Sequence, residues 1–429
     1  MTTQNLTYQT KYKRVFEWGK IIAITGSSQI LVQAVGFLSG ILIIRMLSTT
    51  EYALYTIANT MLGTMLVLTN GGIVTGLISE GSKVWQDKDK LGAVMVTGME
   101  LRNKFSFFSL IIAIPIMLYL LLHHGSTWLM SCAIVISIIP IYFLTLSGAL
   151  LEIPAKLTQD IVKLQKIQIG SNLLRLIFVS VLLFISPWAF VVLLAAGIPQ
   201  LWTNIRIRKA ITGYTNLHQR TEPGVRDKII SVVKKILPGS VYYCLSGQIT
   251  IWLISVFGTT SSVAQIGALG RLAMVLSIFT IVFNTLVTPR FARLPNESNI
   301  LLTRYTQITA GTIAFFLVII LFTWLFPKEI LWILGESYSN LESEIVFYII
   351  GTSISMTAGG IFSLYISKGW IINPIVSIPI SLLSVSILIF TIDISTLSGI
   401  LIFNIIIATS ELLMHSIFVI LKLKSIIKD

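Results

Sequence analysis

Four ionisable residues lie within, or at the end of, long apolar stretches of this sequence. Arg271 and Arg175 are cations, Glu411 is an acid, and Arg45 ends the first long apolar stretch. Charge is costly inside a bilayer, so an ionisable residue there is by default a functional-site hypothesis. Arginine offers counter-charge and fixed donors to an anion, and a buried carboxylate can carry a coupling proton. The sequence therefore predicts binding by the arginines and ion coupling by Glu411.

Each of these residues also has a structural interpretation. Arg271 would extend to the outer headgroups or bond helix carbonyls, and Arg175 is shallow enough in its span to reach the inner headgroups. Glu411 would form a local hydrogen bond with His415 or a serine. For Arg45, electrostatic capping of the helix C-terminus is favoured over a role at an outer opening. Both interpretations stay open for Arg271, Arg175 and Glu411.

Polar residues are grouped on helix faces rather than scattered through the apolar stretches. Such faces avoid lipid and are expected to meet other helices or water. The faces comprise Gln29, Gln33, Gly36 and Gly40; Thr56, Asn59, Gly63 and Asn70; Gln168, Asn172 and Arg175; and Ser277, Thr280, Asn284 and Thr288. Together with Arg290 after the last of these faces, they supply the predicted substrate-binding residues Gln29, Gln33, Asn59, Asn172, Asn284 and Arg290.

The elements that hold these residues are predicted to be membrane-spanning helices. Of the 429 residues 55% are hydrophobic and only 11% are charged, against about 25% in soluble proteins. The mean hydropathy is +0.86. Apolar stretches of about 20 residues, enough to cross a bilayer, recur along the whole chain. We predict twelve spans, at 21–44, 52–76, 105–122, 127–150, 169–186, 188–205, 236–257, 263–287, 305–326, 345–367, 370–392 and 397–421.

The distribution of basic residues predicts the orientation. With both termini in the cytoplasm, 27 of the 31 Lys and Arg residues fall in inner segments and two, Arg45 and Lys328, in outer loops. Cytoplasmic loops of membrane proteins carry this excess of positive charge. The net charge of +13 is then explained by topology and by attraction to anionic inner-leaflet lipids, so nucleic acid is not an expected partner.

The longest inner loop, 206–235, carries eight basic residues and is predicted to be a cytoplasmic linker. It separates an N-terminal lobe, 1–205, from a C-terminal lobe, 236–429, each with six spans. The opening hairpins of the two halves are weakly similar, which predicts pseudo-symmetry. Internal repeats that meet at a central site are typical of secondary transporters.

The sequence indicates no enzyme. It contains no phosphate-binding glycine loop, no zinc-type His-Glu-x-x-His pattern, and no paired Asp near a predicted membrane face. Cys132 and Cys244 fall inside predicted spans without a Cys or His at ligand spacing, so neither a disulfide nor a metal site is expected. No cofactor is predicted. The predicted outer loops are too short to bind the acceptor of a glycan ligase or polymerase.

Several short motifs resemble the polysaccharide transporter branch of the multidrug/oligosaccharidyl-lipid/polysaccharide (MOP) flippase superfamily, and most of all its bacterial O-antigen flippases. The first runs from Arg45 to Tyr55 (RMLSTTEYALY), where Ala53 replaces the usual Gly. The others are Ile266–Leu272 (IGALGRL), Pro289-Arg290, and Leu334–Tyr338 (LGESY). The resemblance extends over essentially the whole chain, although each motif is short.

This resemblance implies a twelve-helix, two-lobe transporter in the bacterial cytoplasmic (inner) membrane. Such proteins move a polyprenyl-diphosphate-linked oligosaccharide from the inner to the outer leaflet by alternating access. Arg271 and Arg175 would face the diphosphate, the polar amides would face the sugars, and the isoprenoid tail would stay in lipid. The implied partners are membrane lipids, a coupling ion (H⁺ or Na⁺), and the glycan polymerase and chain-length proteins of the same pathway.

Two other functions stay open at this point. A cation-coupled exporter of small drugs or metabolites would use the same fold but a more acidic cavity. A non-transporting membrane scaffold or glycan-assembly partner would have no need of polar faces on at least five spans. The two intramembrane arginines, against the single acid Glu411, favour the flippase.

Overall fold

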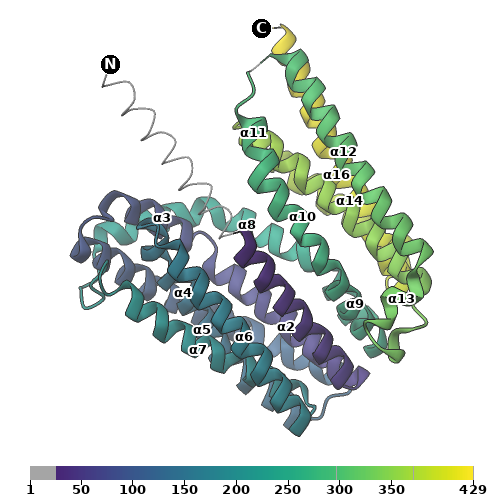
Figure 1. Cartoon of the computed structure of the whole chain (residues 1–429), viewed down its shortest axis with the longest axis horizontal. Helices are drawn as coiled ribbons and strands as arrows, with labels where there is room; N and C mark the ends of the chain where they lie inside the picture. Colours follow the sequence, from purple (N-terminus) through teal and green to yellow (C-terminus); the bar gives the residue numbers. More distant parts are fainter. Residues whose placement is uncertain (1–25, 296, 371, 429) are drawn as a thin grey trace, which may run out of the picture. The chain divides into compact units, whose positions relative to one another are not determined.

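The computed structural model describes residues 26–295, 297–370 and 372–428, and every regular element in these ranges is a helix (Figure 1). The prediction of an all-α membrane protein is confirmed. In the described part of the chain, ten helices are long and apolar enough to cross a membrane. An eleventh candidate is the bent helix pair Pro223–Tyr242 and Ser246–Phe257, and Ser377–Thr391 is a shorter apolar helix. The total of twelve spans and the cytoplasmic termini stay predictions, and residues 21–25 of the first predicted span lie outside the described residues.

The helices form two compact units. The described part of the first unit comprises residues 26–46 and 58–245. In this unit α5, α6 and α7 run side by side, and α4 packs on α5 (Figure 1). Its elements are the helix Gly26–Met46, most of α2 (Thr49–Asn70), α3 (Ile73–Val84), α4 (Lys88–His123), α5 (Trp128–Leu157), α6 (Ile161–Ile185), α7 (Ala189–Ile211) and the first part of α8 (Pro223–Phe257).

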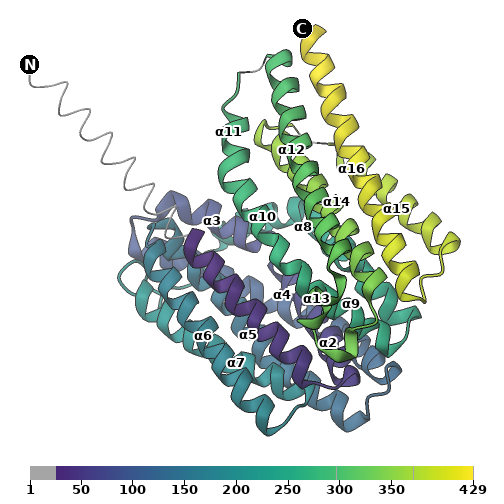
Figure 2. The ribbon, with the colours of Figure 1, turned by 45° about the vertical axis from the view of Figure 1, so that its right-hand side comes forward.

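The second unit comprises residues 47–57 together with the chain from 246 onward. Its main layer is α12, α14 and α16, which contact one another pairwise, with α15 against α16 (Figure 2). Besides the ends of α2 and α8, its elements are α9 (Thr260–Ala273), η1 (Met274–Leu276), α10 (Ser277–Val282), η2 (Phe283–Val287), α11 (Thr288–Ala292), α12 (Ser298–Leu325), α13 (Pro327–Trp332), η3 (Glu336–Tyr338), α14 (Glu342–Ser367), α15 (Pro374–Thr391) and α16 (Leu397–Lys428).

The second predicted span, 52–76, is too long by several residues. The helix α2 ends at Asn70, and α3 begins only after Gly71 and Gly72. Gly72 has φ = 92°, a left-handed conformation that side chains disfavour, and a Cβ at this position would lie 2.9 Å from the Cα of Val233. The close approach of the α8 backbone therefore requires glycine here, and the helix breaks where the apolar pattern alone suggests continuity.

Several helices extend beyond the predicted bilayer-spanning segments. The helix α4 begins at Lys88, and the segment 206–235 is largely helical, because α7 continues to Ile211 and α8 begins at Pro223. The first turns of α8 bury Val225, Ile229 and Val233 at four-residue spacing in a core cluster with α3, α4 and α5. This apolar face packs the basic segment onto the first unit.

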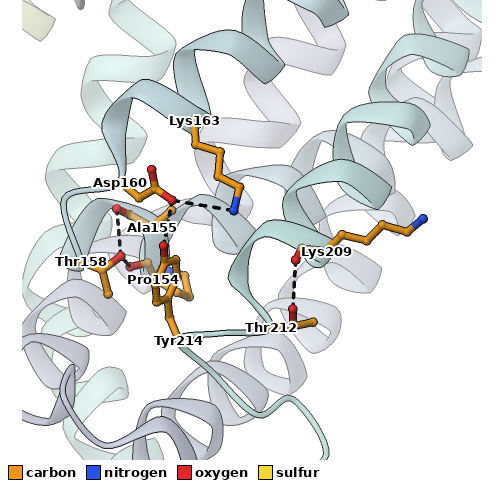
Figure 3. A network of polar contacts seen from close by, with 8 residues as sticks. All are labelled: Pro154, Ala155, Thr158, Asp160, Lys163, Lys209, Thr212 and Tyr214. Carbon is orange, nitrogen blue, oxygen red and sulfur yellow. Dashed lines mark hydrogen bonds and ion pairs between the residues drawn. The ribbon is translucent and has the colours of Figure 1, made fainter.

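The turn between α5 and α6 is held by backbone and side-chain bonds (Figure 3). Gln159 adopts φ = 60°, and the amide of Asp160 donates to the carbonyl of Ala155 at 2.9 Å, closing the helix with a Schellman arrangement. The hydroxyl of Tyr214, beyond the end of α7, donates to the Asp160 carboxylate at 2.9 Å. This bond raises the pKa of Tyr214, and it ties the α5–α6 turn to the chain after α7.

Apolar side chains cover much of the outward-facing helix surface. Phe107, Phe108, Ile112 and Phe390 are among the large exposed hydrophobic residues, and Phe390 is 90% exposed. A surface of this kind is stable against lipid rather than water. Together with the ten long apolar helices, it identifies the chain as a multi-pass membrane protein.

Candidate functional site

The side chain of Arg271 contacts a group of tyrosines in the second unit. Its Nη2 donates to the hydroxyl of Tyr55 at 3.3 Å, and its Cζ lies 6.0 Å from the centre of the same ring. Tyr52 lies beside Tyr55, with ring centres 6.0 Å apart, and Tyr338 meets Tyr52 edge-on at 6.4 Å. All three tyrosines are buried. We call Arg271, Tyr52, Tyr55 and Tyr338 the arginine–tyrosine cluster.

Local sequence explains how the cluster forms. Gly267 and Gly270 lie on α9 one turn and one residue before Arg271, and they allow close approach of neighbouring side chains. A Cβ on Gly267 would lie 2.5 Å from the Thr56 hydroxyl, and one on Gly270 would lie 3.2 Å from the Tyr348 hydroxyl. The motifs IGALGRL, EYALY and LGESY thus meet in one place. Burial raises the pKa of the Tyr338 phenol.

Neither intramembrane arginine forms an ion pair among the described residues. No described carboxylate oxygen lies within 4.0 Å of Arg271 or Arg175. Arg175 is half-buried on α6 in the first unit, and its Nε is buried without a described hydrogen-bond partner. Each arginine therefore retains donors and positive charge that described acids do not neutralise.

Gln29 and Asn172 belong to a polar network in the first unit. The Gln29 amide lies 3.3 Å from the Gln165 oxygen and 3.5 Å from that of Gln168. Gln168 donates to Glu152 at 3.0 Å, and Glu152 pairs with Lys156 at 2.7 Å. The Asn172 amide donates to the backbone oxygen of Gln168 at 2.8 Å. The predicted polar face of α6 is therefore bonded to the helix Gly26–Met46 and to α5.

The other predicted residues of the first unit are not part of this network. Gln33 is half-buried and Asn59 is exposed, although Asn59 lies between buried residues of α2. Arg45 is exposed at the end of the helix Gly26–Met46. These placements are consistent with capping by Arg45 and with a wet environment for Asn59.

Asn284 lines a cavity of about 230 Å³ within the second unit. It belongs to η2, a π-helical turn, and π-helical turns occur often at functional sites. Thr288 donates to its side-chain oxygen at 3.3 Å. Arg290 is exposed on α11 and is not among the residues that line this cavity.

Glu411 lines a separate water-sized cavity of about 10 Å³ between α15 and α16. The hydroxyl-bearing residues around it are Ser381, Ser384 and Ser410. A space of this size is about the minimum that one water needs. His415, the partner in the alternative interpretation, instead lies 3.2 Å from the Tyr365 hydroxyl. Glu411 makes no hydrogen bond or ion pair with any residue in the described part of the chain.

Arg102 is only 6% exposed and is not among the predicted site residues. Its Nη2 donates to Asn103 at 2.8 Å, and its Nε and Nη1 have no partner among the described residues. The predicted start of the third span at 105 places Arg102 in an inner loop. Apolar residues recur at i, i+3 and i+4 from Leu91 to Leu101, and they are buried in α4. This spacing is the signal that predicts a helix beginning before residue 105.

Comparison with known proteins finds similarity in structure only. No protein-family model and no curated protein sequence matches the chain. An inward-facing multidrug resistance MATE family transporter of the MOP superfamily matches with a TM-score of 0.64 and 14% identity, over 92% of this chain and 96% of that one. An outward-facing structure of a MATE family transporter matches with a TM-score of 0.59 and 14% identity, over 95% and 96%.

A MOP superfamily transporter from Pyrococcus furiosus matches with a TM-score of 0.56 and 13% identity, over 96% of this chain and 97% of that one. Reversed polarity of its binding pocket is taken to suggest a different function for that protein. Coverage this complete shows that the chain has the fold of MATE transporters. At these identities the likeness establishes the fold and leaves the cargo open.

The arginine–tyrosine cluster predicts a measurable energetic coupling. We expect Tyr55→Phe and Arg271→Met each to lower the thermal unfolding midpoint of the purified protein, because each removes a buried charge-assisted bond. The double variant should lose less than the sum, with a coupling of about 1–3 kcal/mol. Tyr305→Phe, at a buried tyrosine outside the cluster, is the control. Strictly additive losses for Tyr55→Phe and Arg271→Met would show that the two side chains do not stabilise each other.

Proposed function

We propose that this protein is a transporter that moves a polyprenyl-diphosphate-linked oligosaccharide across a bacterial cytoplasmic membrane by alternating access. The cargo would pass from the cytoplasmic to the periplasmic leaflet. The shared fold supports alternating access, since MATE transporters of this fold have inward-facing and outward-facing structures. The motif resemblance to O-antigen flippases supports the glycolipid cargo.

The observation that carries the proposal is the pair of intramembrane arginines without acidic partners. A cation in a low-dielectric setting attracts an anion much more strongly than it does in water. Cargo with a diphosphate would supply the missing negative charge. Arg175 is the better candidate for this contact, because its half-buried guanidinium makes no hydrogen bond with a described residue, whereas Arg271 already donates to Tyr55.

The neutral polar groups fit the remainder of such a cargo. Gln29, Asn59, Asn172 and Asn284 present amides that can bond sugar hydroxyls. The isoprenoid tail needs no protein partner, because it stays in the lipid that surrounds the apolar helix surfaces. Membrane lipids, and the polymerase and chain-length proteins that act on the exported glycan, are the partners that this function requires.

A second candidate is a cation-coupled exporter of small drugs or metabolites. The likeness to multidrug resistance MATE structures favours it. A cationic drug, however, is best recognised by a carboxylate, and the cavity beside Asn284 contains none. Pocket polarity has already been used to suggest a separate function for the Pyrococcus furiosus protein with this fold. Because the cavity beside Asn284 contains no carboxylate, we propose the glycolipid ahead of a cationic drug as the cargo.

Arg175 provides the test of the cargo. Purified protein would be reconstituted in liposomes holding a polyprenyl-diphosphate-linked oligosaccharide, and a membrane-impermeant glycosidase would report how much lipid has crossed. We expect Arg175→Ala to reduce crossing at least about tenfold, because a counter-charge is lost, and Arg175→Lys to retain part of the activity. Arg206→Ala, at an exposed arginine of the same unit, should behave as wild type.

Full activity of Arg175→Ala at normal protein content would remove Arg175 from the mechanism. If the wild-type protein moves no glycolipid but exports a cationic dye from the same liposomes, the drug exporter is the correct function.

Glu411 is proposed as the coupling residue, because it lies beside a water-sized cavity on the hydroxyl-lined α15–α16 contact. We expect Glu411→Gln to abolish the acceleration of transport by an imposed proton or sodium gradient, since the amide cannot change charge. The measurement is transport into the same liposomes with and without each gradient. The control is Glu336→Gln, at an exposed acid of the same unit. An unchanged gradient response in Glu411→Gln would end the coupling role.

A further inference from the structure

The cavity beside Asn284, which we call the Asn284 cavity, is formed by two segments of the second unit. Its volume is about 230 Å³. One wall is the end of α10 and the π-helical turn η2, and the other is the middle of α14. The lining residues are Phe279, Thr280, Phe283, Asn284, Ser355, Met356, Gly359, Gly360 and Ser363.

Hydrogen-bonding groups remain available in this cavity. The hydroxyls of Thr280 and Ser355 are on exposed residues and have no described hydrogen-bond partner. Asn284 accepts a bond from Thr288 through its Oδ1, which leaves its amide nitrogen without a described partner. Ser363 instead donates to the Gly359 carbonyl at 3.0 Å. Three side chains from two helices therefore offer donors and acceptors to the same space.

Aromatic rings form the apolar part of the wall, and they are held in place. Phe279 and Phe283 have ring centres 5.5 Å apart, and Phe279 stacks on Phe315 at 5.3 Å. Phe283 is buried and approaches Gly360, where a Cβ would lie 3.3 Å from its ring. The glycine at 360 thus leaves room for the ring, and the rings present a fixed apolar face.

No lining residue is ionisable, which narrows the class of ligand. A cationic ligand would lack a carboxylate, and an anionic one would lack a lysine or arginine. A lipid chain would leave the Thr280 and Ser355 hydroxyls unpaired in an apolar contact, which is unfavourable. A sugar ring has hydroxyl groups for the polar side chains and an apolar C–H face for the phenylalanine rings.

We propose that the Asn284 cavity binds one uncharged sugar ring, with its hydroxyls toward Asn284, Thr280 and Ser355 and its C–H face on Phe279 and Phe283. The volume is below the roughly 300–1,000 Å³ typical of sites for drug-sized ligands, which fits a single ring rather than a whole oligosaccharide. The identification of this ring as part of the cargo rests on the proposed function. The binding of sugar itself does not.

Gly359 offers a way to fill the cavity without disturbing the packing. It lines the cavity, and a Cβ on this residue would meet no atom within 4 Å. Gly359→Leu therefore places its Cβ in open space, and it favours the helix because leucine is a better helix former than glycine. Gly311→Leu is the matched control, since Gly311 is an exposed α12 residue with the same open surroundings.

The experiment measures sugar binding to the full-length protein, purified in a detergent without a sugar headgroup. The probe is octyl glucoside below its micelle-forming concentration, and its binding is followed by the saturable rise in the thermal unfolding midpoint. Octyl sulfate and octyltrimethylammonium present the same chain with charged heads. We expect saturable stabilisation by the glucoside alone, at least about tenfold weaker binding in Gly359→Leu, and wild-type binding in Gly311→Leu.

A pair of Thr→Val variants separates hydrogen bonding from shape. Thr280 lines the cavity, whereas Thr285 lies on the same segment and donates to the Ile281 carbonyl. We expect Thr280→Val to weaken glucoside binding about threefold to tenfold, as for one lost hydrogen bond, and Thr285→Val to leave it unchanged. Undiminished binding in Gly359→Leu, or equal stabilisation by a charged octyl compound, would overturn the sugar site.

The outcomes also separate this site from the transport proposal. One outcome is that Gly359→Leu abolishes glucoside binding while the wild-type protein moves no glycolipid. This result would support the site and contradict the proposed function. The other outcome is that the wild-type protein transports glycolipid while the Gly359→Leu variant binds glucoside normally. This result would contradict the site and leave the proposed function intact.

Discussion

The structure depends on one constraint, which is that polar and charged groups inside an apolar helix bundle must have a partner or water. The exposed helix surfaces that are suited to contact with lipid are apolar, as at Phe107 and Phe390. In other apolar segments, on α2, α10 and η2, Asn59, Thr280 and Asn284 are exposed. Neutral polar groups exposed on otherwise apolar helices are stable only beside water or a polar ligand. The proposal of a transporter follows from this arrangement.

The same constraint explains why α2 belongs to both units. Its first turns, within 47–57, carry Tyr52 and Tyr55, and these phenols surround the guanidinium of Arg271 on α9. A buried cation without an acid needs such neighbours, through hydrogen bonds and contact with the ring faces. The remainder of α2 packs with the first unit. The arginine–tyrosine cluster therefore holds the first turns of α2 against α9 within the second unit.

Much of the fold follows from the sequence, since apolar stretches of about 20 residues have few alternatives to membrane helices. Of the predicted polar stripe Ser277, Thr280, Asn284 and Thr288, two members, Thr280 and Asn284, line a cavity. Helix ends were predicted less well. The break at Gly71 and Gly72 lies inside an apolar stretch, and only the approach of α8, with Leu237 beside Gly71 and Val233 beside Gly72, shows why two glycines stand there.

The tyrosine partners of Arg271 were not predictable from spacing. They depend on contacts between residues far apart in the chain, such as Tyr55 with Arg271, and helical periodicity reports only on one helix at a time. Glu152 is a similar case, because its half-buried carboxylate is neutralised by Lys156 one turn later and bonded to Gln168 on another helix. The balance of charge inside the bundle therefore required the structure.

The most direct test of the account is the water accessibility of the polar face in membranes. Single cysteines would be introduced by Thr280→Cys, Asn284→Cys and Ser355→Cys in a chain whose Cys132 and Cys244 are replaced by serine. Their reaction with a membrane-impermeant thiol reagent would be compared with that of Leu317→Cys, at an exposed apolar residue of α12. The account predicts fast labelling at the three polar positions and almost none at 317. Protection of all four would show a dry interior and contradict the transporter.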